Sequence, residues 1–239
     1  MNRKRAAARA AAVATIVGLA TLVGSTGVAS AGESISGQVA QQDSRSHAGY
    51  STSGRDVTRV EAEWTIPSVD CSVTPNSRSS IMVSFDDQAG QPTDSVGTSA
   101  DCHGGKAHYY GWYQEMDGPR RTMYDPMQAG DRADAGAYVL NSYVDLHLNN
   151  YSAGTNDRAT SFPSGTVAVW AKHKPASHQL WPLSDFGTVY FTDVLIDQQP
   201  IADGDVVAWR MVGTDGAVRA LPSGLHDDGS FAVLWRRAS

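Results

Sequence analysis

Apolar and polar residues alternate with a period of two along much of this chain, the spacing of strands that bury one face. These runs are rich in β-branched and aromatic residues, and turns rich in Gly, Pro, Asp, Asn and Ser separate them. They cover residues 57–66, 81–85, 109–114, 137–149, 166–171, 188–195, 206–212 and 231–235. After residue 32, no segment keeps apolar residues at helical spacing for three turns. The pattern predicts an all-β antiparallel domain over residues 47–239, either a sandwich or a barrel.

The first 31 residues have the three parts of a secretory signal peptide. Residues 1–9 are basic, residues 10–23 are apolar, and residues 29–31 form an Ala-Ser-Ala cleavage pattern. An uncleaved membrane anchor is the alternative, but the apolar run is short for a spanning helix, which needs about 20 residues. We therefore expect cleavage before Gly32, a flexible polar lead-in over residues 32–46, and a secreted domain.

The charge composition limits the classes of partner that we expect this domain to bind. The 239 residues contain 19 Lys and Arg against 25 Asp and Glu, a formal net charge of −6. Four of the bases lie in the predicted signal peptide, so the mature chain has 15 bases against 25 acids, a net charge of −10. Nucleic acids and anionic membranes attract basic surfaces. We therefore expect neither nucleic acid nor, after cleavage, a membrane as a partner, and we expect a monomer.

The two cysteines of the chain, Cys71 and Cys102, are too few for a four-cysteine zinc site. Export to an oxidising compartment favours their pairing, and closing a loop of about 32 residues is worth roughly 3–4 kcal/mol. Two free buried thiols are the alternative. The closest histidine pairs are five residues apart, which on a strand puts their side chains on opposite faces. We expect a disulfide and neither a metal nor a cofactor.

Five short sequence motifs follow one another along the chain. They lie at residues 63–67 (EWTIP), 83–86 (VSFD), 96–98 (VGT), 110–113 (YGWY) and 183–192 (LSDFGTVYFT). Their order and spacing resemble the glutamic peptidase family, the eqolisins, in its bacterial branch. The resemblance spans about residues 46–235. It implies a sandwich of two antiparallel sheets, one of them concave, with a peptide or protein substrate lying across the concave face.

The resemblance also implies a catalytic pair, a Glu that carries protons for the attacking water and a Gln that stabilises the oxyanion. The Gln stands two residues before the glycine of the Gly-Thr phrase, and that position holds Ser95. The Glu stands directly before a tryptophan, here Trp170, so its position holds Val169. No acid lies between Asp157 and Asp185, a run of 27 residues. Valine cannot carry a proton, so both catalytic positions are substituted.

Other positions that the resemblance assigns to the site are partly changed. Met82 replaces a family tryptophan and Gln114 a family glutamate, whereas Asp86 matches. Tyr110 and Trp112 alternate with Gln114 along one strand, so the three share a face. They either line a groove or belong to the core. The candidate binding residues are Met82, Asp86, Ser95, Tyr110, Trp112, Gln114 and Val169.

Three functions fit these residues. The first is a secreted, catalytically inactive homologue that binds a peptide, or a glycan through aromatic stacking. The second is an active acid endopeptidase that works through relocated residues, with Asp86 and Glu115 the first candidates. The third is a glycan-binding or glycan-hydrolysing sandwich. Loss of a general acid/base costs about 10²–10⁴ in rate, and this favours the first hypothesis.

Overall fold

The computed structural model describes residues 39–52, 57–86, 92–115, 118–161, 166–172, 175–176 and 179–239. The predicted signal peptide and the first residues of the lead-in lie outside these ranges. Strands dominate the described residues, which hold one short helical turn, η1 (Ile201–Asp203), and no helix long and apolar enough to cross a membrane. The all-β prediction is confirmed.

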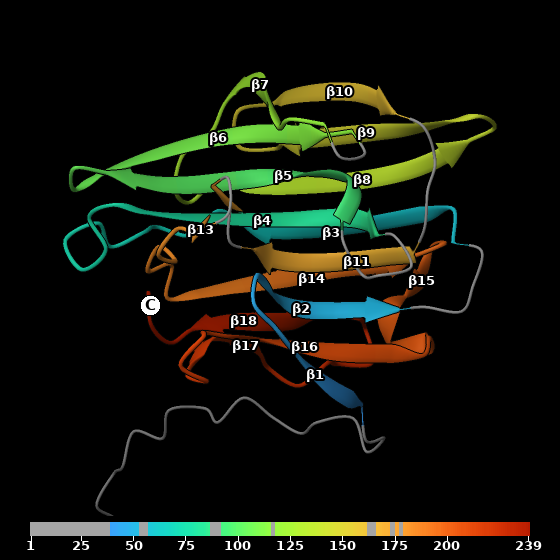
Figure 1. Cartoon of the computed structure of the whole chain (residues 1–239). Helices are drawn as coiled ribbons and strands as arrows, with labels where there is room; N and C mark the ends of the chain where they lie inside the picture. The colour runs from blue at the N-terminus through green and yellow to red at the C-terminus, as the bar shows by residue number, and fades with distance from the viewer. Residues whose placement is uncertain are drawn as a thin grey trace, which may run out of the picture. The chain divides into compact units, whose positions relative to one another are not determined.

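The strands form one hydrogen-bonded path that folds into two facing layers (Figure 1). The first layer consists of β16 (Val206–Val212), β2 (His47–Thr52), β11 (Thr166–Lys172), β4 (Ser77–Asp86), β5 (Pro92–His103), β6 (Lys106–Gln114) and β7 (Arg121–Pro126). We call it the β4–β5 layer. Strand β1 (Ala40–Ser44) pairs in parallel with β16.

The second layer, which we call the β3–β8 layer, lies behind the first in Figure 1. It consists of β10 (Thr155–Ser161), β9 (Tyr143–Asn150), β8 (Arg132–Leu140), β3 (Arg59–Thr65), β14 (Thr188–Ile196), β18 (Phe231–Trp235) and β17 (Val218–Pro222). The pairing of β17 with β16 joins the layers, and β15 (Gln199–Pro200) pairs with β14. Two short strands, β12 (Pro175–Ala176) and β13 (Gln179–Leu180), pair with each other.

The period-two pattern explains why the layers face each other. Along β3, Val60, Ala62 and Trp64 are buried, and the residues between them are partly exposed. Trp64 packs against Phe191 with ring centroids 5.9 Å apart. Its indole N–H donates to the hydroxyl of Thr98 on β5, at 3.0 Å. One apolar core between the layers, with this hydrogen bond inside it, therefore ties β3 to β5.

The eight predicted strand segments are all present, with two differences. The segment 137–149 is two strands, β8 and β9, because the chain turns at Asn141, whose φ is 59°. The domain also begins before residue 47, because Ala40–Ser44 of the predicted flexible lead-in adds β1 to the edge of β16. That edge would otherwise present unpaired backbone groups.

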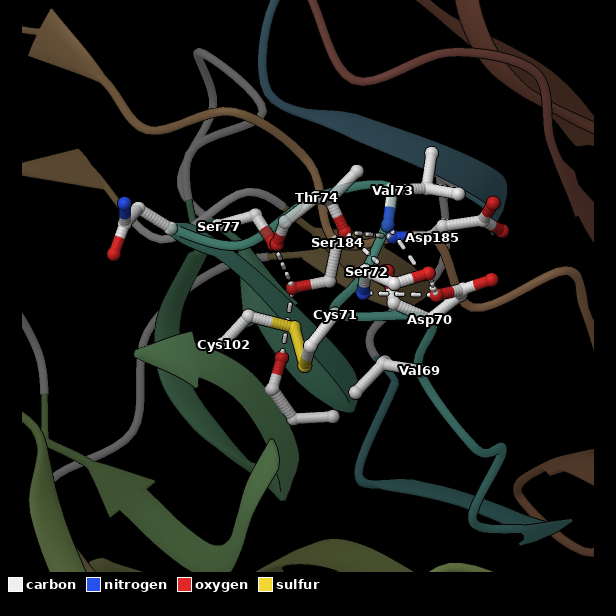
Figure 2. The surroundings of a disulfide bond; sticks show 12 residues. Val69, Asp70, Cys71, Ser72, Val73, Thr74, Ser77, Cys102, Ser184 and Asp185 are labelled. Carbon is white, nitrogen blue, oxygen red and sulfur yellow. Dashed lines mark hydrogen bonds between the residues drawn. A yellow bond between two sulfur atoms is a disulfide. The ribbon is translucent and has the colours of Figure 1, made fainter. Parts of the chain in front are cut away.

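Cys71 and Cys102 form the predicted disulfide (Figure 2). It ties the turn after β3 to the end of β5. Beside it, the Ser184 hydroxyl donates to the carbonyl of Ala100 and accepts from Ser77. The hydrogen bonds of Ser184 therefore hold the start of the Asp-Phe-Gly phrase against β4 and β5, beside the disulfide.

Candidate functional site

The β4–β5 layer has an outer face that points away from the core and is unusually polar and aromatic. Register rows across the sheet define it, because directly paired residues place their side chains on the same face. One row runs Ser51, Ala168, Ser84, Ser95 and Gln114 across five strands. The next row contains Met82, Gly97 and Trp112. Six of the seven predicted binding residues, Met82, Asp86, Ser95, Tyr110, Trp112 and Gln114, lie on this face.

Met82 and Trp112 are fully buried although they point away from the core, and they pack together with Tyr110 and Trp209 as neighbours. Gly97 lies between them in register. A Cβ on Gly97 would lie 2.0 Å from the carbonyl oxygen of Ile81. The glycine of the Gly-Thr phrase is therefore needed so that β5 can approach β4. The sequence left open whether Trp112 lines a groove or belongs to the core. In the structure it belongs to a second, small apolar cluster on the outer face.

Ser95, at the family Gln position, is 1% exposed. Among the described residues its hydroxyl has no hydrogen-bond partner. The indole N–H of Trp112 is likewise buried without a partner there. The outer face therefore contains two polar groups whose hydrogen bonding the described residues leave unsatisfied, an arrangement that is costly in a folded protein.

The two carboxylates described on this face, Asp86 and Asp101, are buried, and each accepts a hydrogen bond. Asp86 accepts a hydrogen bond of 2.6 Å from the Ser84 hydroxyl. Asp101 accepts one of 3.0 Å from Tyr110, and its carboxylate lies 3.7 Å from Nε of Arg78. Burial, with the charge of Asp101 as a second cause, raises the pKa of Tyr110 to about 12. The phenol therefore stays protonated and donates to Asp101 at any physiological pH.

Arg120 lies over this face from the segment that precedes β7. Its guanidinium carbon is 3.6 Å from the centroid of the Trp112 ring, and one Nη donates to the Ser80 hydroxyl at 2.7 Å. Arg78 stacks in the same way on Trp181, at 4.4 Å. Both arginines were missed by sequence reasoning. They follow no family phrase, and for Arg120 no alternation pattern extends into its segment.

Val169 stands in a different row from Ser95. It pairs with Tyr50 on one side and with Val83 on the other, and Val83 pairs with Val96. Ala168, not Val169, pairs with Ser84 in the row of Ser95. The two positions that the family phrases assign to the catalytic pair are therefore one residue out of register with each other, because Val169 pairs with Val83 whereas Ser95 pairs with Ser84.

Two further predicted residues lie near the site without completing it. Glu115 follows the last residue of β6, and its backbone carbonyl accepts from the N–H of Gly118. Gln114 is partly exposed at the end of the Ser95 row. Across the described part of the chain, no group of three or more His, Cys, Asp or Glu side chains is placed to hold a metal ion.

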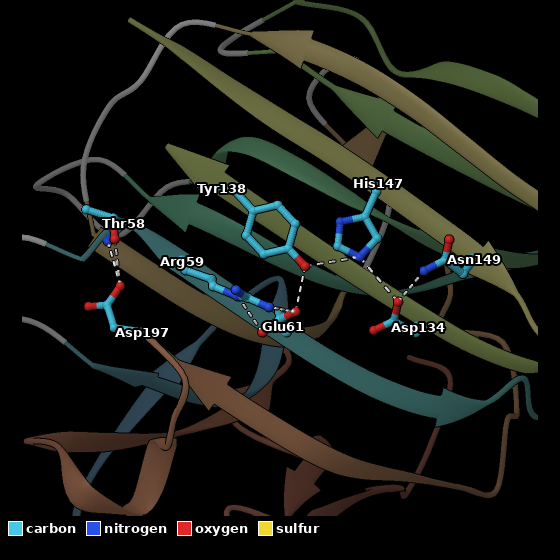
Figure 3. Close-up of polar contacts among 8 residues, drawn as sticks. All are labelled: Thr58, Arg59, Glu61, Asp134, Tyr138, His147, Asn149 and Asp197. Carbon is cyan, nitrogen blue, oxygen red and sulfur yellow. Dashed lines mark hydrogen bonds and ion pairs between the residues drawn. The ribbon is translucent and has the colours of Figure 1, made fainter. Parts of the chain in front are cut away.

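A separate polar cluster covers the outer face of the β3–β8 layer (Figure 3). Glu61 accepts from Tyr138 and from both Nε and an Nη of Arg59. Asp134 accepts from Asn149 at 2.6 Å and contacts Nε2 of His147 at 3.2 Å. These residues border a depression of about 380 Å³. Each of the two carboxylates contacts neighbouring polar groups of the same layer, and this favours a structural role.

The fold and the outer face together define a two-layer β-sandwich with a polar, aromatic face on one layer, the architecture of the glutamic peptidases. The sequence profile of the peptidase A4 family matches residues 45–200. This chain therefore belongs to the peptidase A4 family. A search of curated proteins finds no match.

Solved structures of this family share the fold. A scytalido-glutamic peptidase with a transition state analog inhibitor superposes with a TM-score of 0.68 at 15% identity, covering 80% of this chain and 98% of that one. SCP-B, an eqolisin in complex with the tripeptide Ala-Ile-His, gives 0.62 at 14% identity over 80% of this chain and 100% of its own. Aspergilloglutamic peptidase from Aspergillus niger gives 0.57 at 18% identity, over 67% and 99%.

Proposed function

We propose that this protein is a secreted, catalytically inactive member of the peptidase A4 family that binds peptides across the outer face of the β4–β5 layer. Secretion rests on the signal-peptide pattern of residues 1–31. The binding proposal rests on the family fold and on the aromatic side chains of the outer face.

One observation carries the inactive part of the proposal. Hydrolysis of an amide without a metal or a covalent nucleophile needs a carboxyl group that is free to exchange a proton with water. Asp86 and Asp101, the carboxylates described on this face, are buried away from water and accept hydrogen bonds from Ser84 and Tyr110 respectively. Strand β11 contains no acid at all. The family's general acid/base therefore has no evident replacement.

The binding part is supported by what relatives hold. SCP-B was crystallised with a tripeptide, and scytalido-glutamic peptidase with a peptide-based transition state analog. In this chain Tyr110, Gln114 and Trp209 are partly exposed around the buried Met82–Trp112 pair. Aromatic rings beside hydrogen-bonding groups suit a peptide, whose side chains and backbone need both.

Affinity selection tests this proposal directly. Immobilised protein is incubated with a synthetic library of randomised hexapeptides with free C-termini, and retained peptides are identified by mass spectrometry. We expect enrichment of a defined set of peptides. Tyr110→Ala, which removes a partly exposed ring of this face, should lose that set, whereas Tyr190→Ala, which removes an exposed ring on β14 of the other layer, should retain it. Absence of any enriched peptide, or equal enrichment by Tyr110→Ala, would refute peptide binding at this face.

A further inference from the structure

Arg120 has an unusual electrostatic environment for an arginine packed against a protein surface. Its guanidinium stacks on Trp112 and donates to the neutral hydroxyl of Ser80. None of the described carboxylates forms an ion pair with it. A guanidinium has five N–H donors, so most of its capacity remains open, and the residue is only partly buried.

Two other arginines of the described chain, Arg59 and Arg210, have a different environment. Arg59 and Arg210 each make a two-pronged contact with a carboxylate, Glu61 and Asp43 respectively. Those hydrogen bonds raise the pKa of both arginines. Burial instead lowers the pKa of Arg120 to about 10, because the attraction of the nearby Tyr110 and Asp101 does not offset the loss of water.

Asp101 attracts Arg120 without forming an ion pair with it. One oxygen of its carboxylate accepts from Tyr110 and lies 3.7 Å from Nε of Arg78, and Oδ1 is buried without a hydrogen-bond partner among the described residues. Asp101 therefore lies between two arginines, and Arg120 has no carboxylate within ion-pair distance in the described part of the chain. Burying part of a charge without a partner is unfavourable, whereas a guanidinium and a carboxylate form strong bidentate pairs.

We infer that Arg120 binds a carboxylate of the peptide that occupies the outer face. This rests on the proposed function and adds the class of ligand, a peptide with a free C-terminus or with an Asp or Glu side chain. The protein body is acidic, so a local cation is what makes an anionic peptide acceptable here.

The test uses hexapeptides from the affinity selection, each synthesised in three forms. The first is the parent, the second has every Asp and Glu replaced by its amide, and the third has an amidated C-terminus. Dissociation constants are measured by calorimetry for the unmodified protein, Arg120→Gln and Arg158→Gln. Arg158 is an exposed arginine of β10 in the other layer, so its substitution makes the same charge change away from the face.

We expect one of the two amide forms to bind the unmodified protein about 10- to 100-fold more weakly than the parent. This difference should disappear in Arg120→Gln and persist in Arg158→Gln. The form that loses affinity identifies the carboxylate as C-terminal or side-chain. The inference is overturned if enriched peptides bind but neither amidation weakens them, or if the loss is as large in Arg120→Gln. Failure to enrich any peptide would instead refute peptide binding, the proposed function on which this inference rests.

Discussion

The indole N–H of Trp64 donates a 3.0 Å hydrogen bond to the hydroxyl of Thr98 inside the core. The two residues belong to opposite layers, β3 and β5, and to two of the phrases that resemble the glutamic peptidases, Glu-Trp-Thr-Ile-Pro and Val-Gly-Thr. In this chain the two phrases thus meet in the core and join the two layers, a role that does not involve the positions of the catalytic pair.

This contact predicts a stability effect. Thr98→Val keeps the shape of the side chain but leaves the buried Trp64 N–H without an acceptor, which costs about 1–3 kcal/mol. Urea unfolding followed by tryptophan fluorescence measures the change. Thr65→Val, at an exposed position of β3, is the matched control and should change stability by less than about 0.5 kcal/mol. Equal stability of the two variants would show that the hydrogen bond contributes nothing.

The disulfide should contribute more than any single hydrogen bond. Replacing both Cys71 and Cys102 by alanine should lower the free energy of unfolding by about 2–5 kcal/mol, because the unfolded chain regains the freedom of a closed loop. Urea unfolding of the native protein in the presence of a reductant should give the same loss. An unfolding midpoint that reduction leaves unchanged would contradict this role.

Alkaline pH should destabilise the fold through buried tyrosines. Burial raises the pKa of Tyr50 and Tyr110 to about 12, while an unfolded tyrosine loses its proton near pH 10. The folded state therefore holds its protons longer. The stability is fully present below about pH 10 and falls as the pH rises toward 12. Urea unfolding at stepped pH should show this fall, and Tyr50→Phe should make it shallower. A pH-independent free energy across this window would be inconsistent with these shifts.

The register of β11 predicts that glutamate substitutions at positions 168 and 169 have different effects on stability, which the family motifs alone do not predict. Val169→Glu puts a carboxylate in the row of the buried Val83 and Val96, whereas Ala168→Glu puts it in the row of Ser84 and Ser95. An unpaired charge in a row of buried apolar residues is costly. We expect Val169→Glu to lower the free energy of unfolding by several kcal/mol more than Ala168→Glu, measured by urea unfolding.

The opposite order of stability would show that Val169, as the Trp170 phrase suggests, shares a face with Ser95. Each variant combined with Ser95→Gln then indicates which position can support acid proteolysis. A gain of cleavage by the Ala168 pair alone supports the register, and a gain by the Val169 pair alone supports the phrase alignment.

Much of the fold could be predicted because its signals are local. The alternation along β3 and the pairing of two cysteines in an oxidising compartment needed no knowledge of the partner strands. Strand β5 escaped the pattern because its outward residues are Ser95, Gly97, Ser99 and Asp101, and its inward residues are small. Such a strand is recognisable only from its pairing with β4 and β6.

The site could be predicted only in part, for a related reason. Residues on regular strands, such as Met82 and Trp112, could be predicted from the family motifs and from the alternation of side chains along a strand. The cation that lies over them, Arg120, comes from a connecting segment whose course depends on tertiary contacts. Likewise, the row in which Val169 stands is set by its pairing with β2 and β4, and a shift of one residue exchanges the faces.

The central claim is that this peptidase A4 member keeps the sandwich and has lost the chemistry. The most direct measurement is incubation of the purified mature protein with an unfolded protein substrate between about pH 2 and pH 5, where a glutamate with a reference pKa of about 4.3 would be protonated or near its midpoint. Mass spectrometry should detect no new peptides. Cleavage that survives repurification, resists chelators and serine reagents, and is lost in Asp86→Ala or Glu115→Ala would contradict the account and identify the relocated acid.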